Sequence, residues 1–242
     1  MNPRAVLVTG AAGGIGTAVV QAFLTDGAEV VALDLVAPDL HGGPGLSIAA
    51  DLTDEQAVAE AFDAIAARYG CLETIANVAG INHRATLTQM QLADWDRMMD
   101  VNLGGMFLTA KYGIPLLSRG IAPSIVNMAS ISGHVASDDF PAYVTTKAAI
   151  ESFTGALSQE AGERGIRVNA VAPGWVDAGF THAAMAEGNA GQIHEAASKA
   201  HLLGRMARAE EVANAFVWLA SPGASFVTGQ TLFVDGGLMR VH

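Results

Sequence analysis

A glycine-rich turn between two short apolar runs restricts the fold of this chain more than any other part of its sequence. The apolar runs, Ala5 to Thr9 and Glu29 to Asp34, have the length and composition of buried strands. Between them lie the turn Gly10-Ala11-Ala12-Gly13-Gly14-Ile15-Gly16 and a segment with helical periodicity, Thr17 to Leu24. Strand, glycine turn, helix and strand make up the βαβ unit that binds phosphate groups at a helix N-terminus.

The turn and Asp34 together predict a dinucleotide site. Glycines let the backbone approach a pyrophosphate, and aligned N–H groups receive its negative charge. Asp34 follows Gly16 by 18 residues, near the position where an acid binds an adenosine ribose. The alternative interpretation of Asp34 is a solvated carboxylate at the end of a strand.

The rest of the chain continues the alternation of strands and helices. Further strands are expected at Leu46 to Ala50, Leu72 to Ala76, Ser124 to Met128, Ile166 to Val171 and Thr231 to Val234. Helices are expected from Asp54 to about Tyr69 with Thr53 as N-cap, from Asp94 to about Leu117, from Tyr143 to near Gly162, and from Glu210 to Ser221. This alternation predicts an α/β fold, a doubly wound parallel sheet of about seven strands of Rossmann type, with helices on both faces. Because no linker divides the chain, residues 1–242 are expected to form one domain.

Composition excludes several classes of partner. The 13 basic and 24 acidic residues give a net charge of −11, which argues against nucleic acid or an anionic membrane as partner. The single cysteine, Cys71, excludes an internal disulfide and a cysteine metal cluster and fits a reducing cytosol. No apolar run reaches the length of a membrane span and the N-terminus leaves no room for a signal peptide, so a cytoplasmic location is expected. The hydrophobic fraction of 51% predicts surface buried between subunits.

Tyr143 and Lys147 are four residues apart in a segment of helical character, which places both side chains on one face. A free tyrosine, with a pKa of about 10, is a poor base at neutral pH. A positive charge at roughly 5 Å, with an effective dielectric constant near 20, is worth about 3 kcal/mol, or some two pKa units. The pair is therefore expected to bring the tyrosine toward the range in which it exchanges a proton. Taken alone, the spacing also fits a surface helix on which the two residues are neighbours by accident.

A set of motifs in a fixed order resembles the short-chain dehydrogenase/reductase family, in its compact single-domain branch. The motifs are Thr9-Gly10-x-x-x-Gly14-x-Gly16, Asn77-Val78-Ala79-Gly80, Asn102, Ser130, Tyr143-x-x-x-Lys147 and Pro173-Gly174. The resemblance extends from Thr9 to Gly237, and the interval of 13 residues between Ser130 and Tyr143 is the usual one in the family. It implies an NAD(P)-binding domain in which residues 177–208 form the substrate loop.

The resemblance also implies roles for four catalytic residues. Tyr143 would be the acid when a carbonyl is reduced and the base when an alcohol is oxidised, with its pKa lowered by Lys147, which also holds the nicotinamide ribose. Ser130 would hydrogen-bond the substrate oxygen, and Asn102 would distort its helix and hold a water that links Lys147 to solvent. Hydride transfer leaves an alkoxide charge that requires such donors. The structural alternatives are that Ser130 caps a strand end and that Asn102 satisfies backbone groups in a helix interior.

The same resemblance implies contacts with NAD. Gly10, Gly14, Ile15 and Gly16 would line the phosphates, Asp34 would bind the adenosine ribose, Asp51 and Leu52 would flank the adenine, and Asn77, Ala79 and Gly80 would lie on the adenosine ribose side of the cleft. Tyr143, Lys147, Pro173 and Val176 complete the set, with Val176 at the nicotinamide carboxamide. One departure is Ala178, where the family often has a threonine whose hydroxyl contacts that carboxamide. Thr181 is the candidate substitute.

The histidines do not predict a metal site. His182, His194 and His201 include no pair at i, i+4 with a carboxylate at zinc-site spacing, so a substrate-loop role or solvation is expected. His134 and the turn Asp138-Asp139-Phe140 lie between Ser130 and Tyr143, which places them at the edge of the substrate pocket. His134 is a candidate polar contact with the substrate.

These observations predict an NAD-dependent oxidoreductase that interconverts a secondary alcohol and a ketone, working as a homo-oligomer, a tetramer, on a small molecule. One alternative is a 3-oxoacyl thioester reductase that uses NADPH. Asp34 disfavours a phosphorylated cofactor, the turn Ile121-Ala122-Pro123 offers no basic residue for an acidic carrier, and the net charge would repel one. Another alternative is a catalytically silent NAD-binding sensor, which has no chemical reason to keep Ser130, Tyr143 and Lys147.

Overall fold

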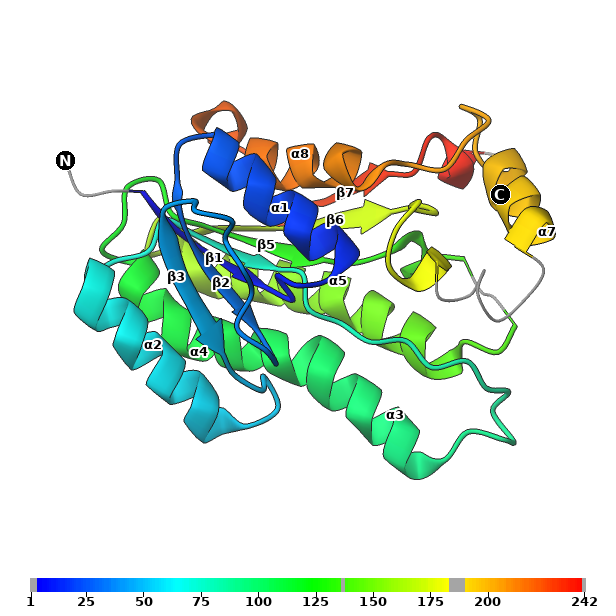
Figure 1. Cartoon of the computed structure of the whole chain (residues 1–242), viewed down its shortest axis with the longest axis horizontal. Coiled ribbons are helices and arrows are strands. Elements are labelled where there is room, and N and C mark those ends of the chain that lie inside the picture. Colours follow the sequence, from blue (N-terminus) through cyan, green and yellow to red (C-terminus); the bar gives the residue numbers. More distant parts are fainter. Residues whose placement is uncertain (1–3, 136–137, 183–189, 241–242) are drawn as a thin grey trace.

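A parallel seven-stranded sheet forms the centre of the molecule in a computed structural model that describes residues 4–135, 138–182 and 190–240 (Figure 1). Its strands are β1 (Ala5–Thr9), β2 (Glu29–Asp34), β3 (Gly45–Ala49), β4 (Thr74–Asn77), β5 (Ser124–Met128), β6 (Arg167–Pro173) and β7 (Thr231–Val234). The strand order is β3-β2-β1-β4-β5-β6-β7, and each neighbouring pair is parallel. The predicted doubly wound sheet is therefore confirmed.

Helices cover both faces of the sheet, as predicted. The helices are α1 (Gly14–Thr25), α2 (Glu55–Tyr69), α3 (Leu92–Met99), α4 (Gly105–Leu117), α5 (Pro141–Gly162), α7 (Ala190–Ala200) and α8 (Ala209–Ala220). A π-helical turn, η1 (Asp100–Gly104), joins α3 to α4, and three short 3-10 turns are η2 (Ile131–Gly133), η3 (Pro222–Ala224) and η4 (Leu238–Arg240). In Figure 1, α1 and α8 lie on one side of the sheet, and α2, α4 and α5 lie on the other.

Alternate residues of β1 enter two separate cores, which explains why the strand is apolar throughout. Val6 and Val8 pack with residues of α1 and α8, whereas Ala5 and Leu7 pack with residues of α2 and α4. Each residue of β1 is buried. A strand covered on both faces needs apolar side chains at consecutive positions, so the apolar run in the sequence predicted this central strand correctly.

Two predicted boundaries are wrong for local reasons. The N-cap of α2 is Asp54, whose carboxylate accepts hydrogen bonds from the N–H groups of Gln56 and Ala57, whereas Thr53 hydrogen-bonds Asp51. Both residue types are good N-caps, and only the geometry of the turn decides between them. The fourth strand begins at Thr74 instead of Leu72, because the N–H of Leu72 donates to the carbonyl of Leu116 and not to a neighbouring strand.

The long helix predicted from Asp94 to Leu117 is present but is divided by the π-helical turn η1 around Asn102. This distortion is what the family resemblance implied for Asn102. A Cβ on Gly105 would lie 3.0 Å from the Cβ of Leu52, so the glycine permits close packing of α4 against the loop after β3. The glycines weaken the helix, but at Gly105 the missing side chain allows the segment with Leu52 to pack closely.

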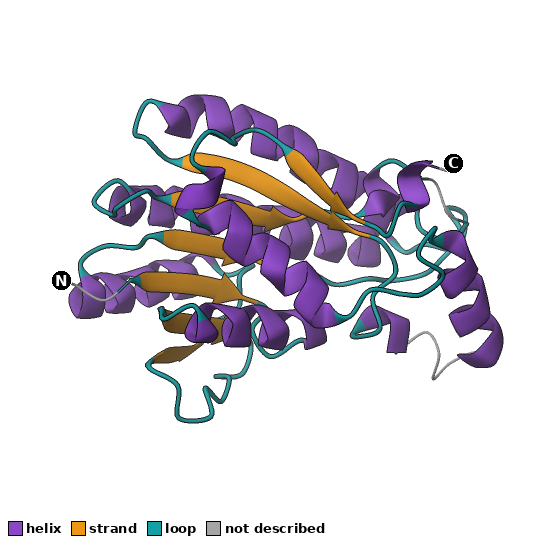
Figure 2. Cartoon of the chain, turned by 90° about the horizontal axis from the view of Figure 1, so that it is seen from above, coloured by secondary structure: helices purple, strands orange, loops and turns teal. Residues whose placement is uncertain are grey.

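The segment 177–208 stands apart from the sheet. Figures 1 and 2 both place α7 beyond the carboxyl ends of the strands. Among its described residues the only strand-like pairing is an isolated bridge between Val176 and Ala207, in agreement with the prediction of no firm strand there. No helix among the described residues has both the length and the apolar character to span a membrane.

Candidate active site

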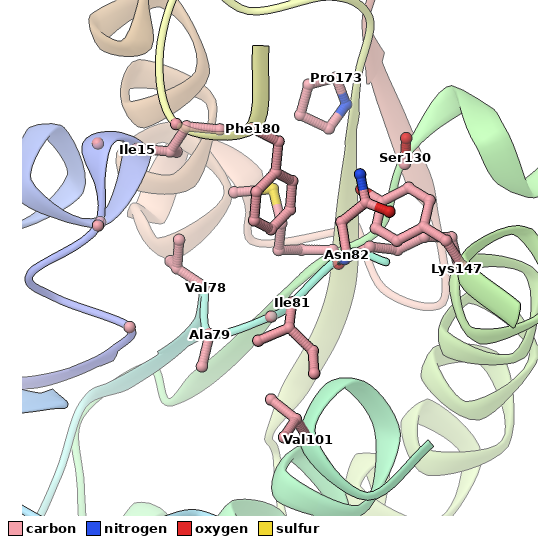
Figure 3. A pocket seen from close by; sticks show the side chains of 18 of the residues that line it. Ile15, Val78, Ala79, Ile81, Asn82, Val101, Ser130, Lys147, Pro173 and Phe180 are labelled. Carbon is pink, nitrogen blue, oxygen red and sulfur yellow. Dashed lines mark hydrogen bonds between the residues drawn. The ribbon is translucent and has the colours of Figure 1, made fainter. Parts of the chain in front are cut away.

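A pocket of about 1020 Å³ opens at the carboxyl ends of the strands, where parallel α/β sheets bind ligands. Segments that follow β1, β2, β3, β4, β5 and β6 contribute to its lining, together with α5 (Figure 3). Of the residues predicted to bind the cofactor, those that line this pocket are Gly10, Gly14, Ile15, Gly16, Asp34, Asp51, Leu52, Ala79, Gly80, Tyr143, Lys147, Pro173 and Val176. The fold therefore brings most of the predicted site together from distant parts of the chain.

The glycine turn has a shape that side chains would prevent. Gly10 has a φ of +64°, and a Cβ there would lie 2.6 Å from the Cα of Ala79. A Cβ on Gly16 would lie 1.9 Å from the carbonyl oxygen of Gly10. The N-cap of α1 is Gly13, which has no side chain to cap the N–H groups of the first turn. Because Gly13, Gly14, Ile15 and Gly16 line the pocket, the uncapped N–H groups of this turn fit the pyrophosphate of a dinucleotide.

Asp34 is fixed beside this turn. Its Oδ2 accepts a hydrogen bond of 2.9 Å from the Ala12 N–H, and its Oδ1 accepts one of 2.7 Å from the Leu35 N–H. A carboxylate has about four lone-pair directions, so both oxygens remain able to accept hydrogen bonds from ribose hydroxyls. The residues present therefore fit a nicotinamide dinucleotide.

Asn77 is the one predicted cofactor residue whose side chain points away from the pocket. Asn77 is buried and does not line the pocket; its amide donates to Asn127 at 2.9 Å and accepts from the Thr109 hydroxyl at 2.8 Å. Asn127 in turn donates to Thr154 at 3.0 Å, which ties β4, β5 and α5 together. The side chain of a strand residue next to the pocket can point into the core, and the motif alone does not give its direction.

Ser130, Tyr143 and Lys147 meet at the other end of the pocket. Lys147 is buried, its Nζ donates to the Met128 carbonyl at 2.8 Å, and this Nζ lies 5.4 Å from the centre of the Tyr143 ring. The Ser130 side chain lies close enough to the Tyr143 phenol for its hydrogen-bonding effect to lower the pKa of the phenol. It also accepts from the Ser132 N–H at 3.1 Å, so Ser130 caps η2 while it contacts the phenol.

The predicted lowering of the Tyr143 pKa does not occur in the protein alone. Burial raises the pKa of Tyr143 to about 12, and only the hydrogen bond from Ser130 opposes this rise. Burial also lowers the pKa of Lys147 to about 7. At neutral pH the lysine is therefore only partly charged, which weakens the attraction on which the prediction depended.

Asn102 acts on the pocket through a neighbouring loop. It is buried, lies outside the pocket lining, and its Oδ1 accepts from the Ile81 N–H at 2.7 Å. Its amide nitrogen donates to the Ile81 carbonyl at 3.0 Å and to the Thr146 hydroxyl at 3.2 Å. A Cβ on Gly80 would lie 3.3 Å from Asn102 Oδ1 and 3.7 Å from Lys147 Nζ, so both side chains approach this glycine. The water link to Lys147 stays a proposal.

Sequence reasoning placed Phe140 at the edge of the pocket but missed Phe180, Asn82 and Arg84. The ring centres of Phe140 and Phe180 lie 5.8 and 6.2 Å from that of Tyr143, and both phenylalanines line the pocket. Asn82 and Arg84 also line it, two and four residues after the Asn77–Gly80 motif. Their closeness to this motif is the feature of the sequence that could have predicted their place in the pocket.

The guess that His134 contacts the substrate is wrong. Its Nε2 lies 2.8 Å from a carboxylate oxygen of Glu151, its ring packs against Phe233, and it does not line the pocket. In the turn expected at the pocket edge, Phe140 does line the pocket, and neither Asp138 nor Asp139 does.

The segment after β6 covers the glycine turn. A Cβ on Gly14 would lie 3.0 Å from the Gly179 backbone nitrogen. Ala178 and Thr181 line the pocket, and Thr181 is buried, so Thr181 remains the candidate for the hydroxyl contact that Ala178 lacks. Residues 183–189 of this segment lie outside the described residues.

The three histidines of this segment have structural or solvent-facing positions. His182 contacts Asp177 at 2.9 Å, and His194 is exposed. His201 is buried; its Nε2 accepts from the Trp175 N–H at 3.2 Å, and its Nδ1 lies 2.7 Å from the Ala197 carbonyl. Within the described ranges, no group of three or more His, Cys, Asp or Glu side chains has an arrangement that could hold a metal ion.

Comparisons with known proteins agree with this geometry. The family model described as Enoyl-(Acyl carrier protein) reductase matches residues 10–239. A 3-oxoacyl-[acyl-carrier-protein] reductase of Thermotoga maritima is 34% identical over 99% of both chains. A D-threitol dehydrogenase of Mycolicibacterium smegmatis is 37% identical over 98% of this chain and 93% of the relative. The structure of an aldohexose dehydrogenase of Thermoplasma acidophilum superposes with a TM-score of 0.93 at 32% identity, covering 99% of this chain and 95% of that one.

Proposed function

This chain belongs to the short-chain dehydrogenase/reductase family, and from this premise we propose that it is an NAD-dependent oxidoreductase that interconverts a secondary alcohol and a ketone. The observation that carries the proposal is the single pocket that has the glycine turn and Asp34 at one end and the phenol of Tyr143 at the other. In this proposal residues 1–242 form one NAD-binding domain. One relative is named a D-threitol dehydrogenase and one solved structure an aldohexose dehydrogenase, and both of these named compounds carry several hydroxyl groups, which supports a small hydroxylated substrate.

The proposed roles follow from the contacts of each side chain. A bound nicotinamide ring supplies the hydride acceptor or donor, and its oxidised form carries a positive charge that favours a phenolate beside it. Tyr143 gives its proton to the substrate oxygen in reduction and takes it back in oxidation. Ser130, whose side chain lies beside the phenol, hydrogen-bonds the same oxygen. Lys147 reaches Met128 with one N–H and has two further donors for ribose hydroxyls.

The high pKa of Tyr143 favours its role as an acid. With a pKa of about 12 in the protein alone, the phenol keeps its proton at neutral pH and is ready to donate it to a carbonyl oxygen. For oxidation the phenolate must form, and this requires additional positive charge near the ring. Lys147, with a pKa of about 7, provides only part of that charge.

The second candidate is an NADPH-dependent 3-oxoacyl thioester reductase. It is favoured by the names of the family model and of the Thermotoga maritima relative. Against it stand Asp34 beside the glycine turn, the turn 121–123 without a basic residue and the net charge of −11. A silent NAD-binding sensor is less well supported, because Ser130, Tyr143 and Lys147 keep their mutual contacts.

A dehydrogenase screen tests the proposal. NADH absorbance is followed over a panel of polyols, hydroxy acids and cyclic alcohols, and a 3-oxoacyl thioester with NADPH is included as a competitor. We expect turnover of at least one alcohol with NAD. Turnover of the thioester alone, with NADPH, would replace this proposal by the second candidate, and cofactor binding without any turnover would support the sensor.

Asp34 allows a separate prediction on the cofactor. With NAD its carboxylate accepts hydrogen bonds from ribose hydroxyls, a charge-assisted contact worth roughly 1.5–3 kcal/mol. With NADP it meets a phosphate of the same sign, and at about 4 Å with an effective dielectric constant near 20 each pair of unit charges repels by about 4 kcal/mol before salt screening. Residues 35–45 contain no Lys or Arg to offset this. The expected preference for NAD is at least about a hundredfold in kcat/KM.

The measurement compares kcat/KM for NAD and NADP in the unmodified protein and in Asp34→Ser and Asp34→Arg. Both substitutions are expected to narrow or invert the preference. Equal or better activity of the unmodified protein with NADP would show that Asp34 does not meet the ribose, and would favour the thioester reductase.

A further inference from the structure

The segment that follows β4 presents two polar side chains to the substrate end of the pocket. Asn82 and Arg84 both line the pocket, whereas His83 between them turns away, its Nε2 lying 3.5 Å from Asp94 Oδ2. Alternate residues of an extended segment lie on one side, so Asn82 and Arg84 form one polar surface. The carbonyl reduction proposed above does not use either residue.

Arg84 is held in place by aromatic stacking. Its guanidinium carbon lies 4.4 Å from the centre of the Phe140 ring, and the same ring packs edge-on against Tyr143 at 5.8 Å. The next residue is fixed too, because the Ala85 N–H donates to the Asp139 carbonyl at 3.0 Å. A guanidinium stacked on a ring keeps the N–H groups at its edge free for a bidentate contact. Arg84 is thus oriented beside the ring that adjoins the phenol.

No carboxylate within the described part of the chain forms an ion pair with Arg84. The chain nevertheless carries 24 acidic residues and a net charge of −11. Arg97 is the other arginine of the pocket lining. It follows Asp96 on α3 and is close to Asp100 in the sequence, and both of these carboxylates line the pocket. An anion in this pocket is therefore attracted to Arg84 more than to Arg97.

Asn82 offers an unpaired polar group next to Arg84. Its Oδ1 is buried and has no hydrogen-bond partner among the described residues. Figure 3 shows its amide pointing into the space between Phe180 and Ser130, above Lys147. A buried carbonyl oxygen without a hydrogen-bond partner is destabilising, and a ligand hydroxyl group that donates to it removes that penalty.

We propose that Arg84 binds a carboxylate of the substrate and that Asn82 Oδ1 accepts a hydrogen bond from a hydroxyl group other than the one that is oxidised, so that the substrate is a hydroxy acid with a second hydroxyl group and the product the corresponding keto acid. This inference rests on the proposed function and narrows it. The guanidinium binds both oxygens of the carboxylate, with Phe140 behind it fixing its plane. Arg84 is in this view the residue that determines specificity, because it attracts the anion that the rest of the surface repels.

A binding experiment tests the inference without hydride transfer. The affinities of benzoate and of the uncharged benzamide, neither of which has an alcohol to oxidise, are compared by quenching of tryptophan fluorescence, since Trp175 lines the pocket. The protein is tested alone and with saturating NAD or NADP. Arg84→Met removes the charge and keeps a long apolar side chain over Phe140. Arg97→Gln is the matched control, because it removes the other arginine of the same pocket.

We expect the unmodified protein and Arg97→Gln to bind benzoate at least about tenfold more tightly than benzamide, as a charge-assisted pair implies. In Arg84→Met this ratio falls to about threefold or less. Equal binding of the two probes by the unmodified protein would overturn the inference, and so would a ratio that Arg97→Gln loses and Arg84→Met keeps. These results do not depend on turnover, so a failed dehydrogenase screen leaves this test informative.

Turnover supplies a second readout where an alcohol substrate is found. For a hydroxy acid, Arg84→Met is expected to raise KM by about ten- to a hundredfold with little change in kcat, since the lost contact holds substrate and transition state equally. For the methyl ester of the same acid KM should change less than about threefold. Arg84→Lys, which keeps the charge without the planar fork, is expected to restore part of the affinity. An equal rise in KM for acid and ester would overturn the assignment of a carboxylate to Arg84.

Discussion

Lys147 and Tyr143 illustrate how burial outweighs the attraction between two neighbouring groups. Coulomb's law at roughly 5 Å predicts that the lysine lowers the tyrosine pKa by about two units. The structure buries Lys147 and half-buries Tyr143 in the pocket wall, and this loss of hydration disfavours each charged form: the pKa of Lys147 falls to about 7 and that of Tyr143 rises to about 12. The spacing i, i+4 was sufficient to predict their proximity, but burial depends on α5 being covered by distant segments.

The shifted pKa of Lys147 predicts a dependence of stability on pH. Between about pH 7 and the ordinary lysine pKa of 10.5, the unfolded chain binds a proton that the folded protein does not. The free energy of unfolding therefore rises with pH in this window, and below about pH 7 the full penalty is present. We expect Lys147→Met to be more stable than the unmodified protein at pH 7 by on the order of 3 kcal/mol, with a smaller difference at higher pH.

Urea unfolding of the cofactor-free protein between about pH 7 and pH 9.5 measures this difference. Lys199→Met is the control, because Lys199 is largely exposed on α7 and pairs only with Glu195. Its stability should follow that of the unmodified protein at each pH. A constant gap between Lys147→Met and the unmodified protein across the window would contradict the assignment of a depressed pKa to Lys147.

Tyr143→Phe separates cofactor binding from chemistry. The phenylalanine ring keeps its packing against Phe140 and Phe180, so NAD should bind nearly as well, but the proton donor is lost. A general acid–base group contributes typically 10²–10⁴-fold, and kcat is expected to fall by about that factor. Steady-state kinetics and a titration with NADH give the two values. A variant that retains more than about a tenth of the original rate would show that another group transfers the proton.

At the scale of elements, the π-helical turn η1 connects helix packing with the pocket. The turn places Asn102 so that its amide binds both backbone groups of Ile81, and Ile81 lines the pocket. The sequence also allowed Asn102 to satisfy backbone groups inside its own helix. In the structure it satisfies backbone groups of the loop after β4 instead. π-turns within α-helices frequently occur at functional sites.

Asn102→Ala is expected to affect stability and activity together. It leaves the partly buried N–H and C=O of Ile81 without these partners, at about 1–3 kcal/mol for each group that water cannot reach. The loss of this support should also lower kcat, because the loop that carries Ile81 and Asn82 borders the phenol. Thermal unfolding and steady-state kinetics test both effects. Asn102→Asp keeps the acceptor for the Ile81 N–H but loses the amide donors. Its melting temperature and kcat should therefore lie between those of the unmodified protein and those of Asn102→Ala. An unchanged melting temperature in Asn102→Ala would refute this account.

At the scale of the whole molecule, we predict a homotetramer. Phe107 on α4 is 51% exposed, and a Cβ added to Gly155 or Gly162 on α5 would meet no atom within 4 Å. Small residues on an open helix face allow close approach of another backbone, so α4 and α5 are expected to supply the larger interface. A second exposed aromatic group, Phe226 and Trp218, lies at the other end of the sheet order near β7 and supports a further contact.

Light scattering at micromolar protein concentration measures the mass of the assembly directly. Four times the 24.9 kDa of one chain is the expected mass. Phe107→Glu, which places a charge in the proposed interface, should reduce that mass. Phe226→Ser tests the second contact separately. A monomer of the unmodified protein would contradict the prediction.

The sequence alone determined those features that depend on neighbours along the chain. Buried strands such as Ala5–Thr9 are recognisable because both faces are covered and each position must be apolar, and glycines such as Gly10 and Gly16 are required by backbone geometry within a few residues. The ordered motifs were sufficient for the family and for the approximate course of seven strands. The predicted proximity of Tyr143 and Lys147 belongs to the same class, because helical spacing fixes it.

The tertiary structure alone decided what depends on segments far apart in sequence. Only the tertiary structure shows that the Asn77 side chain lies in the core and hydrogen-bonds Asn127, that His134 contacts Glu151, and that Arg84 stacks on Phe140. It also enclosed Tyr143 and Lys147 deeply enough to shift both pKa values against their charged forms. The physical reason is the same in each case: side-chain direction, burial and desolvation are set by packing between distant elements, and the local pattern of residues does not contain that information.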